Sequence, residues 1–287
     1  MSVYDFEGRL RKTFGKDKLY FSENTPYTDA IGLHNYWSGK FIYHIKRTLV
    51  KKGVIDRTDY DLKNIHELVD SKYINYKQFD GTSPLGQLFY EPDDEFIDYY
   101  HEFLKWLNES VFKFDFYFQA TPTIRFNCAG AQLTGEDKRL PYPRYHCDVD
   151  YGHPPQEINL WWSFTQNKQS GFSVSNLKDS EKWYAEYDFD REKFTQDSWD
   201  NYESFIKRGE SISEEVTNGD GDLMILFDSR TIHSAIERKD KTTRVSVDVR
   251  VIGVEDLEDG HVGNGRMKAE FKPGGKFGYH EKSILNI

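Results

Sequence analysis

Two histidines and one aspartate have the types and spacing of ligands to a single metal ion. His146 and Asp148 lie two positions apart in the run Arg-Tyr-His-Cys-Asp-Val-Asp (144–150), and His233 follows far downstream. On a β-strand, side chains at i and i+2 point to the same face, so an imidazole and a carboxylate at this spacing can reach one cation. Two histidines and one carboxylate that leave positions open suit a non-haem Fe(II) centre. We therefore interpret these three residues as metal ligands at a catalytic centre.

A second pattern follows the downstream histidine. A turn rich in Gly and Asp leads into the apolar run 223–227, which predicts a buried strand just before His233. The run 244–250 then alternates strictly between valines and polar residues, which predicts a strand with one buried face. Arg244 and Ser246 share the polar face. Their N–H donors and hydroxyl are well suited to bind a carboxylate.

In this order, the motifs resemble the Fe(II)/2-oxoglutarate-dependent oxygenases, and within them the phytanoyl-CoA-hydroxylase-like branch. The resemblance extends over residues 125–252 and depends on His-Cys-Asp (146–148), the Gly-Asp-Leu-Met-Ile-Leu-Phe-Asp run before His233, and Arg-Val-Ser (244–246). The eleven positions from His233 to Arg244 fit this branch. The resemblance implies Fe(II) bound by the three ligands, 2-oxoglutarate bound through Arg244 and Ser246, and O₂ as the other co-substrate.

The same resemblance implies a fold and a reaction. The fold would be mainly β with flanking helices: a double-stranded β-helix, that is, a jelly-roll or cupin-like barrel, buttressed by N-terminal helices. The reaction would couple oxidative decarboxylation of 2-oxoglutarate to succinate and CO₂ with hydroxylation of a substrate. Asp148 argues against the halogenase variant, which lacks this carboxylate. Desaturation, ring closure and epimerisation use the same kind of site and remain open.

The 287 residues are expected to form a single domain with parts of different character. Residues 1–112 read as a mainly helical buttress, with candidate helices at 37–50, at 59–69 and from Pro92 onward, and with a loop at 71–90 that could cover the mouth of the site. Residues 113–252 read as the jelly-roll core. The irregular stretch 166–216 is either a lid or a solvated helical decoration. Residues 253–287 form a polar, Gly-rich tail whose segment 271–277 could fold back over the barrel.

Other polar side chains fall on the strands that would surround the metal. Arg125 and Asn159 are candidate contacts of 2-oxoglutarate, although Arg125 is equally well explained by an ion pair at a sheet edge. Three residues are candidate substrate contacts, each with another explanation. Asp150 could instead support a metal ligand, Trp161 could be ordinary core, and Arg250 could pair with an acid. These polar positions favour a small polar substrate such as a sugar, an amino acid derivative or a natural-product precursor.

Composition excludes several other classes. A net charge of −10 argues against a nucleic-acid partner, and no stretch approaches the ~20 apolar residues of a membrane span. Two cysteines give no disulfide framework, and Cys147 reads as a small buried hydrophobe. We therefore expect a cytoplasmic enzyme that acts on a small molecule. The sequence does not determine an oligomeric state.

Three alternatives remain beside this interpretation. His153 follows the His-x-Asp pair closely enough to suggest a local zinc site, although the two prolines after it favour a loop. The chain could also be a cupin-type metalloenzyme that does not use 2-oxoglutarate, or a non-catalytic binding module on the same fold. The pairing of Arg244 with Ser246 counts against both of the latter.

Overall fold

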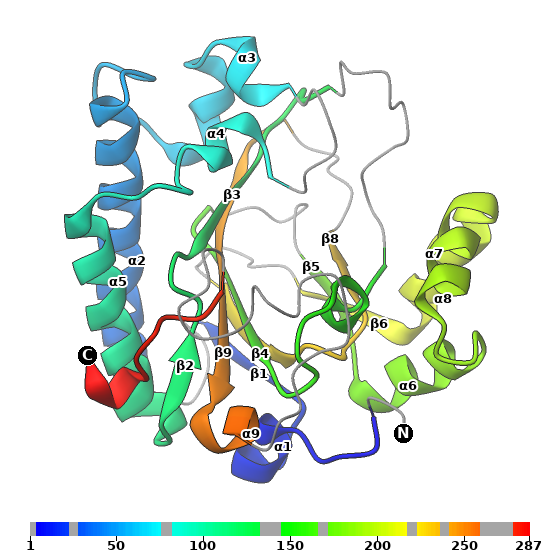
Figure 1. Cartoon of the computed structure of the whole chain (residues 1–287). Helices are drawn as coiled ribbons and strands as arrows, with labels where there is room; N and C mark the ends of the chain where they lie inside the picture. Colours follow the sequence, from blue (N-terminus) through cyan, green and yellow to red (C-terminus); the bar gives the residue numbers. More distant parts are fainter. Residues whose placement is uncertain are drawn as a thin grey trace.

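Two antiparallel sheets lie at the centre of the molecule, with helices packed around them (Figure 1). The computed structural model describes residues 4–22, 28–75, 82–132, 145–165, 172–216, 223–235, 241–258 and 278–287. α-Helices take up more of the described chain than strands do, so the expected mainly-β class is corrected to helices around antiparallel sheets. The described strands form two separate antiparallel sheets, and the predicted jelly-roll barrel stays a prediction.

The larger sheet contains six strands in the order β1-β7-β4-β9-β2, with β3 paired to β9. Strand β9 is the longest described strand, and its strict alternation places Val245, Val247 and Val249 in the core on one face and its polar residues on the other. The alternation predicted from the sequence is thus confirmed. The strands are β1 (Lys18–Ser22), β2 (Phe116–Phe118), β3 (Thr123–Asn127), β4 (Ile158–Ser163), β7 (Leu223–Asp228) and β9 (Arg244–Gly253).

The smaller sheet has the order β6-β5-β8, with β6 at Ser213–Val216, β5 at Phe172–Ser175 and β8 at His233–Ala235. An isolated bridge between His146 and His233 extends it by one position. The inner faces of the two sheets meet in a small apolar core, where the Phe172 ring stacks on Trp161 at 5.1 Å and lies 5.3 Å from Phe227.

The outer face of the larger sheet is covered by α2 (Thr28–Lys51) and α5 (Asp94–Leu107) (Figure 1). Aromatic rings fill this interface, and Trp162 of β4 lies 5.4 Å from Phe103 of α5. Helix α5 begins where Asp93 accepts a hydrogen bond from Phe96 N at 3.0 Å, and acids occupy its first turn. The apolar stripe predicted for this helix is buried, as expected.

The N-terminal region departs from a purely helical buttress, because β1 pairs with β7 of the larger sheet. The candidate helix at 59–69 is only a 3₁₀ segment, η1 (Leu62–Glu67). The other elements of this region are α1 (Arg9–Phe14), α3 (Ser71–Ile74), α4 (Pro84–Gln87) and the π turn η2 (Asn108–Phe112).

The stretch 166–216 is more than an insertion, because β5 and β6 belong to the smaller sheet. Its helices α6 (Leu177–Ala185), α7 (Arg191–Asp200) and α8 (Tyr202–Ile212) form a second core with Tyr145 and Cys147. These helices lie beyond the smaller sheet (Figure 1). The described helices are therefore packed parts of the fold, and residues 166–171 lie outside the described part.

The C-terminal region returns to the larger sheet. After α9 (Val254–Glu258), the described chain resumes at Gly278 and ends with η4 (Ile284–Asn286). His280 N donates to Phe118 O at 2.8 Å, so this last segment lies beside β2. The predicted fold-back of 271–277 lies outside the described residues. None of the described helices has both the length and the apolar character needed to cross a membrane.

Candidate metal centre

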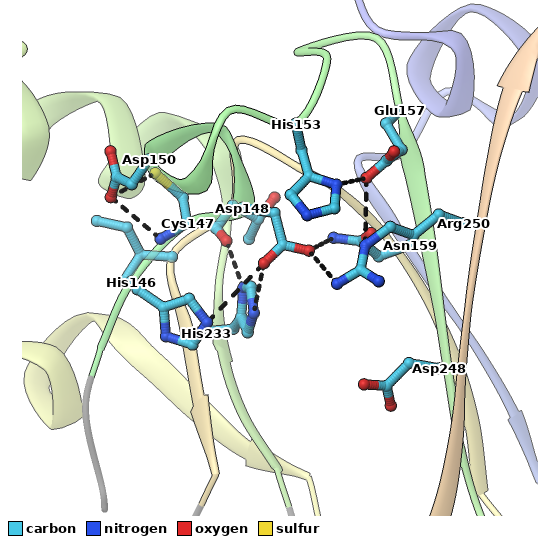
Figure 2. A network of polar contacts seen from close by, with 12 residues as sticks. His146, Cys147, Asp148, Asp150, His153, Glu157, Asn159, His233, Asp248 and Arg250 are labelled. Atoms are coloured by element: carbon cyan, nitrogen blue, oxygen red, sulfur yellow. Dashed lines mark hydrogen bonds and ion pairs between the residues drawn. The ribbon is translucent and has the colours of Figure 1, made fainter. Parts of the chain in front are cut away.

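His146, Asp148 and His233 converge at one point in the structure (Figure 2). Asp148 Oδ1 lies 3.9 Å from His146 Nε2 and 3.6 Å from His233 Nε2, and the two imidazole centroids are 4.4 Å apart. One ligand atom from each residue lies within 4.8 Å of the other two. The three side chains could therefore hold a single metal ion.

The backbone brings the three ligands together in a different way from the predicted strand. His146 and His233 are bridge partners that exchange hydrogen bonds of 3.0 and 2.8 Å. Asp148 begins the 3₁₀ segment η3 (Asp148–Tyr151), and its N–H donates to Ser229 O at 3.0 Å. The chain thus leaves the extended conformation after Cys147, and a tight turn, not strand periodicity, carries the carboxylate to the histidines.

The tautomer of His233 is fixed by its surroundings. Its Nδ1 lies 2.9 Å from Thr231 O, and a carbonyl only accepts, so Nδ1 carries the proton and Nε2 offers its lone pair to the site. Burial lowers the pKa of His233, although the nearby Asp148 opposes that shift. A neutral imidazole with a free Nε2 is the form that binds metals.

The Asp148 carboxylate is held from behind. Its Oδ2 accepts hydrogen bonds from Asn159 Nδ2 at 2.9 Å and from an Arg250 Nη at 3.3 Å, while Oδ1 faces the imidazoles. Burial alone would raise the pKa of Asp148, but Arg250 and the surrounding histidines hold it well below its usual range. The residue is therefore an ionised ligand with one oxygen already engaged.

The three ligands line a cavity of about 560 Å³ between the two sheets. Residues of β3, β4, β7 and β9 in the larger sheet form one wall, and Phe172 and Ala235 of the smaller sheet lie opposite. Thr82 and Tyr90 also line it. The stretch 71–90, predicted as a loop, instead contains α3 and α4, and its segment 82–90 borders the cavity. No described residue of α6, α7 or α8 does so.

Arg244 and Ser246 lie on the inner face of β9, as their alternation predicts. The Arg244 guanidinium lines the cavity and lies 5.5 Å from the centre of the Trp161 ring. Ser246 is fully buried, and its hydroxyl has no hydrogen-bond partner within the described residues. A buried hydroxyl beside a guanidinium fits a group that accepts hydrogen bonds, such as a carboxylate.

Three other predicted contacts pair with acids. Arg125 of β3 forms an ion pair with Asp248 of β9, as one of its two explanations predicts, and both residues line the cavity. Its contact with 2-oxoglutarate stays a prediction. Asn159 contacts the metal ligand Asp148. Arg250 pairs with the same carboxylate and also lies 3.4 Å, at Nε, from Glu157 Oε1.

Asp150 does not share the orientation of Asp148, because the 3₁₀ turn rotates it away (Figure 2). It accepts hydrogen bonds from Cys147 Sγ at 3.2 Å and from the Tyr184 hydroxyl, and it is absent from the described cavity lining. Burial raises the pKa of Asp150. The structure therefore places Asp150 against Cys147 and Tyr184, outside the described cavity lining. Cys147 is fully buried, as predicted, and both cysteines are free thiols.

His153 is buried rather than exposed on a loop, and its Nδ1 lies 2.8 Å from Glu157 Oε1. Glu157 also accepts a hydrogen bond of 2.5 Å from the hydroxyl of Tyr279. Sequence reasoning missed both Glu157 and Tyr279. Glu157 stands two positions before Asn159 and directly before the strand predicted at 158–164. This position is a signal that could have identified it.

No family model matches the chain, and no curated protein matches it. Among solved structures, it is similar to the non-haem alpha-ketoglutarate-dependent carbocyclase SnoK from nogalamycin biosynthesis, with a TM-score of 0.42 and 12% identity over 97% of this chain and 98% of that one. It is also similar to EctD from S. alaskensis with bound Fe, with a TM-score of 0.41 and 10% identity over 88% and 78%. At such low scores and identities, the likeness carries no inference about this chain's activity.

Proposed function

We propose that this protein is a non-haem Fe(II)/2-oxoglutarate-dependent oxygenase that hydroxylates a small polar molecule. The observation that carries the proposal is the convergence of His146, Asp148 and His233 in a cavity that also contains Arg244. We further propose that the two sheets are the walls of a double-stranded β-helix. The spacing of the motifs favours the phytanoyl-CoA-hydroxylase-like branch.

The residues present fit Fe(II). The His233 ring has its Nε2 free for a metal because Nδ1 donates to Thr231. Asp148 supplies a charged oxygen from Oδ1, because Oδ2 is held by Asn159 and Arg250. Two imidazoles and one carboxylate suit Fe(II) with open positions. When bound, iron and 2-oxoglutarate together supply the oxidising chemistry, with release of succinate and CO₂.

The inner face of β9 would orient the co-substrate. Arg250, near the metal ligands, pairs in register with Asn159, and Ser246 pairs with Ser163 further along the same face. A dicarboxylate that reaches from the metal along this face would meet Arg244 and Ser246 at its far end. The guanidinium supplies charge, and the buried hydroxyl gains the partner that the described residues do not provide.

The cavity also offers a hydrogen-bond acceptor to a substrate. Asp248 uses Oδ2 for Arg125, and its Oδ1 is buried without a partner among the described residues. A buried carboxylate oxygen that faces a cavity requires a hydrogen-bond donor. We therefore propose that the substrate presents an N–H or O–H group to Asp248. The rings of Tyr90 and Tyr151 would shield it from solvent at the rim.

An anaerobic titration with Fe(II) and 2-oxoglutarate tests the chemistry. We expect the weak visible charge-transfer band of the chelate in the parent protein. Asp148→Ala should lose it through loss of the metal, and Arg244→Ala should require far more 2-oxoglutarate to develop it. Arg208→Ala removes an exposed guanidinium that pairs with Glu186, and it serves as the matched control.

Two outcomes contradict the proposal in different ways. Tight binding of another metal without a 2-oxoglutarate band would favour the cupin-type metalloenzyme. A parent protein that binds no metal would favour the non-catalytic binding module. Once the band is established, substrates can be screened by the stimulation of succinate release. Asp248→Asn should then weaken this stimulation while the chelate band is retained.

A further inference from the structure

A buried charged cluster lies next to Asp148, on the side away from His146 and His233 (Figure 2). It consists of Glu157, His153, Arg250 and Tyr279, and we call it the Glu157 cluster. The side chain of Glu157 is fully buried, and Tyr279 is 1% exposed. Charges in such a place require partners, because an unpaired buried carboxylate is strongly destabilising. The contacts of Glu157 therefore have to be specific.

Arg250 joins this cluster to the metal centre. One Nη lies 3.3 Å from Asp148 Oδ2, and Nε lies 3.4 Å from Glu157 Oε1. Asp148, His153 and Glu157 also approach within 4.8 Å of one another, a spacing that could suggest a second metal site. The guanidinium already supplies the cation that this pair of carboxylates requires. Two acids therefore share one arginine through different nitrogens, and a movement of the guanidinium toward one acid lengthens its contact with the other.

The C-terminal segment supplies the remaining contact. Tyr279 donates from its hydroxyl to Glu157 Oε2 at 2.5 Å, across 122 positions of sequence. Burial, followed by the charge of Glu157, raises the pKa of Tyr279 well above its usual value, so the hydroxyl remains a donor. The segment is held in place on β2, where Ala120 N donates to Gly278 O at 3.0 Å and the His280 ring stacks on Phe118 at 5.0 Å.

We propose that Tyr279, Glu157 and Arg250 form a positioning relay that fixes the orientation of Asp148, so that the C-terminal segment 278–287 completes the metal site. The relay keeps Oδ2 of Asp148 engaged with Arg250 and leaves only Oδ1 for the metal. A carboxylate that binds through one oxygen leaves a position open that a two-oxygen mode would occupy. The use of that open position by a co-substrate rests on the proposed oxygenase function.

The physical reason for the relay is competition for the guanidinium. When Tyr279 donates to Glu157, part of the carboxylate charge is satisfied, and Arg250 remains available to Asp148. Without that donor, Glu157 attracts Arg250 more strongly, and Asp148 loses a partner on Oδ2. We then expect Asp148 to be less well oriented and to sample contact with the metal through both oxygens. Residues that orient a metal ligand commonly change metal affinity by roughly 10- to 100-fold.

Cobalt binding tests the relay without any need for turnover. Co(II) affinity and the visible spectrum of bound Co(II) would be measured for the parent, Tyr279→Phe, Glu157→Gln and the double variant. Tyr99→Phe is the matched control, because its hydroxyl donates to Trp37 O at 2.8 Å within the helix layer. Both tyrosine variants lose one buried hydrogen bond. Comparing their free energies of unfolding without metal shows whether a change in Co(II) affinity reflects only lost stability.

We expect Tyr279→Phe to bind Co(II) about tenfold more weakly, with an altered spectrum, and Tyr99→Phe to match the parent in both. In the Glu157→Gln background, the further change from Tyr279→Phe should disappear, because the competing charge is gone. Parent-like Co(II) affinity and spectrum in Tyr279→Phe would overturn the relay. An equal loss in both backgrounds would also overturn it.

Co(II) binding and formation of the Fe(II)/2-oxoglutarate chelate together distinguish an error in the relay from an error in the proposed function. If the parent binds Co(II) but forms no 2-oxoglutarate chelate with Fe(II), the oxygenase proposal fails while the relay is still decided by the variants. If the chelate forms but Tyr279→Phe leaves metal affinity unchanged, only the relay fails. A parent that binds neither metal overturns both.

Discussion

Asn159 Nδ2 donates to Asp148 Oδ2 at 2.9 Å, on the carboxylate oxygen that faces away from the two imidazoles. Asn159 lies on β4, which is paired on both sides within the larger sheet, whereas Asp148 lies on a short 3₁₀ turn. A rigid strand therefore orients the ligand that the turn brings to the site. None of the three candidate metal ligands lies on the larger sheet. Its residues Asn159 and Arg250 hold Oδ2 of Asp148 and so leave Oδ1 to face the metal site.

Asn159→Ala should weaken metal binding. The substitution removes one of the two donors to Asp148 Oδ2 and leaves Arg250 as the remaining one. We expect Co(II) affinity to fall by roughly tenfold, the lower end of the range for residues that orient metal ligands. Calorimetric titration measures the change, with Asn201→Ala as control, because that amide contacts Asp197 on the surface. Equal affinity in Asn159→Ala and in the control would contradict the assigned role.

Ser246→Ala should act on the co-substrate rather than on the metal. Its hydroxyl is buried on the face of β9 that also carries Arg244, and it has no partner among the described residues. A lost hydrogen bond to a charged group costs about 1.5–3 kcal/mol, which corresponds to roughly 10- to 100-fold in the 2-oxoglutarate concentration that half-saturates the chelate band. The control is Ser234→Ala, whose side chain lies on the face of β8 opposite His233. It should leave this half-saturating concentration unchanged. A loss of Fe(II) affinity instead would place Ser246 in the metal site.

Local patterns predicted the parts of the fold that local chemistry determines. The alternation of β9 gave the orientation of Arg244 and Ser246, because a slip of one residue would move every valine of that strand out of the core. The acids before α5 and its apolar stripe gave the start and the buried face of the helix. In both elements, each residue is constrained by neighbours within a few positions.

The parts that were missed depend on distant partners. Lys18 to Ser22 form β1 only because β7 is available to pair with them. Asp150 turns away from the cavity, where the hydroxyl of Tyr184, on a helix of the second core, donates to its carboxylate. The contact of Tyr279 with Glu157 joins segments 122 positions apart. No periodicity within either segment contains that information.

Phe103→Ala should strongly destabilise the protein without altering the metal centre. Phe103 is fully buried in the helix layer, with the rings of Phe41 at 5.3 Å and Trp162 at 5.4 Å. Truncation of a buried phenylalanine costs about 3–5 kcal/mol, since it leaves a cavity that the neighbours fill only in part. Urea unfolding measures the loss, and Phe103→Leu, which retains much of the volume, should cost less. Similar losses in both variants would show that cavity volume does not set the cost.

The stability of the fold should decrease as the pH falls below neutral, in part because of His101. Burial, followed by the charge of His280, lowers the pKa of His101 from 6.5, while Asp98 opposes and Lys105 supports that shift. Below 6.5 the unfolded chain binds a proton that the folded chain resists, so the stabilising effect is complete above this pH and is lost as the pH falls through the lower folded value. Urea unfolding across this range should show a shallower pH dependence for His101→Gln than for the parent. His44, whose pKa is also lowered by burial, should flatten the dependence further when it is replaced as well. A parent-like slope in the double variant would assign the acid sensitivity to other groups.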